Sequence, residues 1–90
     1  MNPQEHLELF RDAILRSLKA NRASGMNRFT LEIALHIIGF PRATAEEVEQ
    51  EIQYLMDKGF VAEVAKSHSP ANKRWRLTAA GVDDLDLRGL

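Results

Sequence analysis

Cysteine is absent from this chain of 90 residues, and neither sign of charge dominates it. Without cysteine the chain can form neither a disulfide framework nor a thiolate metal site, and it is compatible with a reducing cytosol. Its longest apolar run is far shorter than the roughly 20 residues that span a bilayer. Residues 1–5 also lack the basic and then apolar pattern of a signal peptide. We therefore expect a soluble, cytoplasmic protein with no membrane partner.

Signs of catalysis are missing too. The sequence has no glycine-rich phosphate loop and no nucleophile motif, and its carboxylates lie on expected helix surfaces without a recognisable acid–base pairing. The three histidines, His6, His36 and His68, are far apart in the sequence and have no cysteine near them. We expect no enzymatic activity, no metal and no cofactor, and no small-molecule ligand is indicated.

The length allows one modest hydrophobic core, so residues 1–90 are expected to form a single domain. Apolar side chains recur at Leu7, Phe10, Ile14 and Leu18, which is the spacing of one helix face. This pattern predicts a first helix over about residues 3–21. A short extended link is expected at residues 26–29.

A second helix is expected over about residues 30–39, with Thr30 as its N-cap because a threonine hydroxyl can accept a bond from a free amide of the first turn. Gly39 and Pro41 end it. One face carries Leu31, Ala34, Leu35 and Ile38. Ile33 and Ile37 lie about 100° or more away from that face. They are either buried under the first helix or the hairpin, or they form a dimer or partner interface.

Residues 44–47 match a capping box, in which the Thr44 side chain bonds to an amide of the first turn and the Glu47 side chain bonds back to the start of the helix. A third helix is therefore expected over about residues 44–58. Its expected buried stripe is Val48, Ile52, Leu55 and Met56. Two helices joined by a tight turn are a helix-turn-helix candidate.

A β-hairpin is expected over about residues 60–77. Its first strand has β-branched and aromatic residues, and its second alternates charged and apolar side chains through Arg74, Trp75, Arg76 and Leu77. The alternation places Trp75 in the core rather than on the surface as a stacking platform. Residues 78–90 are expected to form a short helical turn and an acidic tail.

Two short sequence motifs resemble motifs of a known superfamily. Residues 55–61 read Leu-Met-Asp-Lys-Gly-Phe-Val, and residues 77–81 read Leu-Thr-Ala-Ala-Gly. With the order helix, helix, turn, helix, hairpin, this resembles the winged-helix superfamily and in particular the bacterial MarR-, PadR- and ArsR-like regulators. The resemblance covers most of residues 30–85. It implies a mainly α fold with a small β-hairpin: a winged helix-turn-helix of three helices plus a two- or three-stranded wing.

The resemblance implies binding to double-stranded DNA, with the third helix in the major groove and the wing on the backbone. The charges of this chain modify that expectation. The third helix carries four glutamates, which phosphates repel and which can only accept hydrogen bonds from bases. Residues 66–76 instead hold four lysines and arginines and no acid, and a second basic run, Arg16, Lys19, Arg22 and Arg28, ends the first helix and its loop.

The first hypothesis is therefore a DNA-binding domain, either regulator-like or a DNA-handling accessory of a phage or mobile element, whose wing and residues 16–28 supply the affinity through phosphate contacts. The expected DNA-contact residues are Arg28, Arg42, Thr44, Gln50, Gln53, Lys66, Lys73, Arg74 and Arg76. The second hypothesis is a protein-binding module or homodimer. Its expected interface residues are Ile33, Ile37, Glu46 and Glu49. The basic wing could also be only a solvated strand edge, and the acidic helix only a soluble surface.

Overall fold

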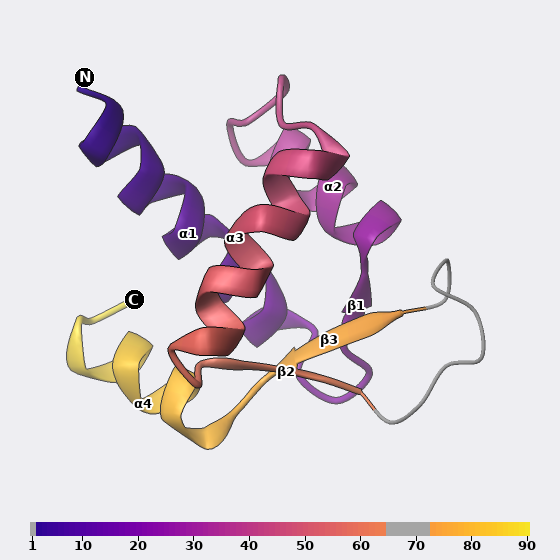
Figure 1. The fold of residues 1–90 in the computed structure, drawn as a ribbon. Helices are drawn as coiled ribbons and strands as arrows, with labels where there is room; N and C mark the ends of the chain where they lie inside the picture. The colour runs from indigo at the N-terminus through magenta and orange to yellow at the C-terminus, as the bar shows by residue number, and fades with distance from the viewer. Residues whose placement is uncertain (1, 65–72) are drawn as a thin grey trace.

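The computed structural model describes residues 2–64 and 73–90. They form a mainly helical structure with a small antiparallel sheet, shown in Figure 1. The elements, in chain order, are α1 (Pro3–Ala20), β1 (Met26–Asn27), α2 (Arg28–Ile37), α3 (Ala45–Asp57), β2 (Val61–Glu63), β3 (Arg74–Leu77) and α4 (Ala79–Leu87). The three helices expected from the sequence are present, and α4 is a fourth.

Helix α1 agrees closely with its sequence pattern. The side chain of Asn2 caps it by accepting a hydrogen bond from the amide of Glu5, and Pro3 occupies the first turn, where no backbone donor is lost. Phe10, Ile14 and Leu18 are buried, as the apolar spacing predicted. The chain then leaves the helix at Asn21.

Helix α2 begins two residues earlier than expected, so the assignment of Thr30 as its N-cap was wrong. The cap is Asn27, whose side-chain oxygen accepts a hydrogen bond from the Thr30 amide at 2.8 Å. The Thr30 hydroxyl accepts one from the Asn27 amide at 3.2 Å, which completes a capping box. Asparagine caps as well as threonine does, and the local pattern did not separate the two.

Helix α3 begins as expected, because the Thr44 hydroxyl accepts the amide of Glu47 at 3.1 Å. Glu47 reaches back to this hydroxyl and not to the Thr44 amide. Val48, Ile52 and Leu55 are buried, and Met56 of the expected stripe is only partly so.

The sheet has three strands in the order β1-β3-β2, all antiparallel. The expected hairpin is formed by β2 and β3, with Val61 opposite Leu77. Residues 26–27, expected as a link, add the third strand, with Met26 opposite Trp75. In β3 the side chains of Trp75 and Leu77 are buried and those of Arg74 and Arg76 are exposed, as the alternation predicted.

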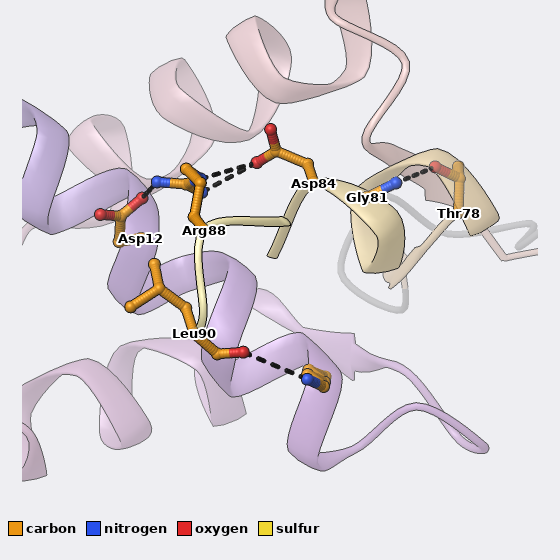
Figure 2. A network of polar contacts seen from close by, with 7 residues as sticks. Asp12, Thr78, Gly81, Asp84, Arg88 and Leu90 are labelled. Carbon is orange, nitrogen blue, oxygen red and sulfur yellow. Dashed lines mark hydrogen bonds and ion pairs between the residues drawn. The ribbon is translucent and has the colours of Figure 1, made fainter. Parts of the chain in front are cut away.

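Helix α4 replaces the expected short turn and tail with a nine-residue helix. The Thr78 hydroxyl caps it by accepting the amide of Gly81 at 3.0 Å, and Leu85 is fully buried. Figure 2 shows how Arg88, just past the end of α4, lies between Asp84 of the same helix and Asp12 of α1. The acidic composition concealed this helix because its few apolar residues find their partners on other elements.

One cluster of buried side chains joins all of these elements. Its fully buried members include Ile14 and Leu18 of α1, Leu31 and Leu35 of α2, Ile52 of α3 and Leu85 of α4. Trp75 and Leu77 of β3 close it on the side of the sheet. This core fixes the sheet against the helices, and so determines which exposed side chains lie together.

Candidate nucleic-acid interface

The exposed side of β3 carries the cations on which the sequence prediction depended. Arg74 and Arg76 point away from the core because Trp75 and Leu77, which alternate with them, are buried. Lys73, just before the strand, is also exposed. Lys66, the fourth cation of that prediction, lies outside the described residues.

Strand β1 brings Arg28, the first residue of α2, next to its ladder with β3. Asn27 pairs with Arg74 across the β1–β3 ladder, and Arg28 follows directly. We call Arg28, Lys73, Arg74 and Arg76 the sheet cations. Arg74 also donates hydrogen bonds to the carbonyl oxygens of Ser24 and Gly25, which ties β3 to the loop before β1. The pairing of residues 26–27 with β3 was not predicted, because two residues are too few for a periodic signal.

The second basic run is divided by the fold. Lys19 donates to Asp86 and to the backbone oxygen of Leu90, each at 3.2 Å. Arg16 lines a groove between α1 and α2. Arg28 alone of this run adjoins the ladder between β1 and β3 through its neighbour Asn27. Residues 16–28 therefore do not form one surface, because the side chains of Arg16 and Lys19 lie against other parts of the molecule than the sheet.

The acidic face of α3 is less negative than its sequence indicates. Arg28 lies 3.6 Å from the carboxylate of Glu49, and Arg11 donates to Glu51 at 2.6 Å while its guanidinium stacks on the Tyr54 ring at 3.7 Å. These partners are 21 and 40 residues from their glutamates in the sequence, so local charge counting could not find them. Glu46 and Glu47, in the first turn, have the helix N-terminus beside them, which favours negative charge.

The other expected contact residues have different surroundings. Arg42 is exposed in the turn between α2 and α3, and Gln50 is exposed on α3. Gln53 donates to Asp57 at 3.0 Å. The Thr44 hydroxyl is occupied by its capping role and by Glu47.

The ion pairs of the sheet cations are open to water. Lys73 lies 3.6 Å from Glu63, and in this pair and in the pair of Arg28 with Glu49 each side chain is about half exposed. Exposed pairs of this kind contribute between 0 and about 1 kcal/mol and weaken with salt. A phosphate oxygen can replace such a carboxylate at little cost.

Arg88 is held away from this surface. Its hydrogen bond to Asp12 outweighs its partial burial and, with the charges of Asp12 and Asp84, raises the pKa of Arg88 above that of a free guanidinium. The distances are 2.6 Å to Asp12 and 2.8 Å to Asp84 (Figure 2). Arg88 therefore joins α4 to α1 as a cation held between two carboxylates.

Ile33 and Ile37 are exposed by 45% and 78%, so the alternative in which they are buried under α1 or the hairpin is wrong. Ile37 lines the groove between α1 and α2, which has a volume of about 920 Å³. Leu9, Ile38, Phe40 and Leu90 line it as well. The remaining residues of the expected protein interface, Glu46 and Glu49, are exposed on α3.

Within residues 2–64 and 73–90, no three histidine, aspartate or glutamate side chains are placed to share a metal ion. His6 packs edge-on against the ring of Phe40, and His36 lies 3.3 Å from the carbonyl oxygen of Ala43. His68 lies outside the described residues. None of the helices in the described part of the chain has the length and apolar character needed to cross a membrane.

Comparison with known protein families found no family model that matches this chain, and comparison with curated proteins found no match either.

Proposed function

We propose that this chain is a winged-helix domain that binds double-stranded DNA, and that the sheet cations make its main contacts with the phosphate backbone. The observation that carries the proposal is the exposed row of cations on β3, beside which the β1–β3 pairing places Arg28 at the start of α2. Two segments far apart in the sequence thus contribute positive charge, one on β3 and the other at the first residue of α2. The resemblance of residues 55–61 and 77–81 to winged-helix regulators supports the same function.

Phosphate contacts of this kind orient a protein on DNA without reading its sequence. Base contacts fall to exposed polar side chains of the turn between α2 and α3 and of α3 itself. Arg42 is exposed in the turn and Gln50 on α3, and both residue types can form two hydrogen bonds with the edge of a base. Glu46 and Glu47 oppose deep insertion of the start of α3, so the sheet cations supply more of the affinity than α3 does.

The test is the salt dependence of binding to a labelled random-sequence duplex, followed by fluorescence anisotropy. Four phosphate contacts predict a slope of log affinity against log salt of about −3 to −4. Replacing Lys73→Ala and Arg76→Ala together should reduce the magnitude of this slope by about 2 and weaken binding by about tenfold or more at low salt.

Arg16→Ala is the matched control for Arg76→Ala, because it removes one exposed arginine from the α1–α2 groove instead of from the sheet. Arg16→Ala should leave the salt slope unchanged, whereas Arg76→Ala should reduce its magnitude by about 1. Absence of binding to any duplex at low salt, or equal losses in the two variants, contradicts the proposal.

A further inference from the structure

Helix α2 carries an apolar stripe that no part of the described chain covers. Phe29, Ile33 and Ile37 are exposed by 68%, 45% and 78%, and they recur every four residues along the whole helix. At 100° per residue the stripe lies opposite Leu31 and Leu35, which are fully buried in the core. Such a stripe is unusual on a small domain, where the side of a helix facing away from the core is normally polar.

The stripe is symmetric about Ile33. If a second α2 packs against it in the antiparallel direction with the two-fold axis at Ile33, each Ile33 meets its own counterpart. Phe29 then faces Ile37 of the second copy, and Ile37 faces Phe29 of the second copy. Residues spaced by four form the ridges that interlock in the commonest class of helix packing, with the two axes crossing at about −50°.

The amount of apolar surface fits a two-fold dimer. Taking about 200 Å² for a fully exposed large side chain, the three residues of the stripe leave roughly 350 to 400 Å² uncovered. Because homodimer interfaces are about 65% apolar, this area corresponds to an interface of about 600 Å² per copy, or about 1,200 Å² in total, which is the lower end of the range for specific interfaces.

We infer that the occupant of this surface is a second copy of the same chain, and that the protein forms a two-fold dimer with α2 packed antiparallel on α2. The surface does not include Lys73, Arg74 or Arg76, and Arg28, which precedes Phe29 on α2, is the one sheet cation beside it. A two-fold axis is the simplest symmetry that covers one patch with the identical patch of another copy.

The absence of cysteine allows a direct test of the register. Ile33→Cys introduces a single thiol that the dimer places beside the same thiol of the second copy. Mild oxidation with diamide should therefore give a disulfide-linked dimer on a non-reducing gel. Leu87→Cys is the matched control, since Leu87 is exposed by 88% on α4, outside the patch. The Leu87→Cys protein should stay monomeric on the gel under the same conditions. Equal cross-linking of the two variants overturns the assignment.

Analytical ultracentrifugation tests the association itself. The unmodified protein should change from monomer to dimer as its concentration rises. Ile33→Glu places two carboxylates at the axis and should weaken association by about tenfold or more. Leu87→Glu should leave it unchanged.

Circular dichroism checks that both glutamate variants are folded. If Ile33→Glu is unfolded, Ile33→Cys still tests the interface, through disulfide formation and with a smaller change of side chain. A monomer at every concentration overturns the inference. A dimer whose association is unchanged by Ile33→Glu also overturns it.

Discussion

Gly81 is the residue at which local preference and tertiary packing conflict most directly. It lies in the first turn of α4, where alanine would favour the helix by about 1 kcal/mol. A Cβ at this position, however, would lie 2.2 Å from the carbonyl oxygen of Phe60 and 3.0 Å from the side chain of Leu77. The Phe60 carbonyl accepts the amide of Thr78, so it cannot retreat without loss of that bond.

We predict that Gly81→Ala lowers the free energy of unfolding by about 1 to 3 kcal/mol, because the cost of overpacking exceeds the gain in helix propensity. Urea denaturation measures the effect. The control is Ala80→Gly, which makes the reverse exchange at the exposed neighbouring position and should cost about 1 kcal/mol or less. A Gly81→Ala protein as stable as the unmodified one contradicts the packing argument.

The same contact explains why threonine and glycine occupy their positions in the motif at residues 77–81. Thr78 caps α4 by accepting the Gly81 amide, and its hydroxyl donates to the carbonyl oxygen of Gly59. Gly59 itself has a φ of +83°, which only glycine adopts readily. The two sequence motifs behind the resemblance, residues 55–61 and 77–81, are thus parts of one junction between α3, β3 and α4.

At the scale of elements, the start of α2 shows how far local signals extend. The sequence correctly indicated that a helix begins near residue 30, but it assigned the cap to Thr30. The structure assigns the cap to Asn27 and the third helical position to Thr30. Pairing of residues 26–27 with β3 decides between them, because it holds Asn27 in extended backbone at the helix start.

This assignment predicts different responses at the two capping positions. Asn27→Ala should lower the free energy of unfolding by about 1 kcal/mol, because an amide of the first turn loses its acceptor. Thr30→Glu should change it by less than about 0.5 kcal/mol, because glutamate at the third position can still complete a capping box. Thermal or urea denaturation compares them. A larger loss for Thr30→Glu than for Asn27→Ala would support the cap at Thr30 and contradict the structure.

At the scale of the whole molecule, Trp75 connects the elements. It is 3% exposed, it belongs to the middle strand of the sheet, and it packs in the same cluster as the buried residues of all four described helices. Its Nε1 is buried and has no hydrogen-bond partner among the described residues. The sequence predicted its burial from the alternation with Arg74 and Arg76, and this prediction is confirmed.

Because Trp75 is the only tryptophan, its fluorescence reports on the core alone. We predict that its emission shifts to longer wavelength with the same urea midpoint at which the helical circular dichroism signal disappears, since a single cluster joins the sheet to the helices. Two separated midpoints would indicate that the sheet and the helices unfold independently.

The sequence by itself determined the approximate limits of α1, α2 and α3, the cap at Thr44 and the buried and exposed sides of β3. These features depend on periodicity and on hydrogen bonds between residues a few positions apart. Only the tertiary structure decided that the residues just before Arg28 pair with β3, that arginines lie beside Glu49 and Glu51, that Ile33 and Ile37 are uncovered, and that α4 exists. Each of these depends on contacts between residues far apart in the sequence, which the packing of the core selects and local patterns do not encode.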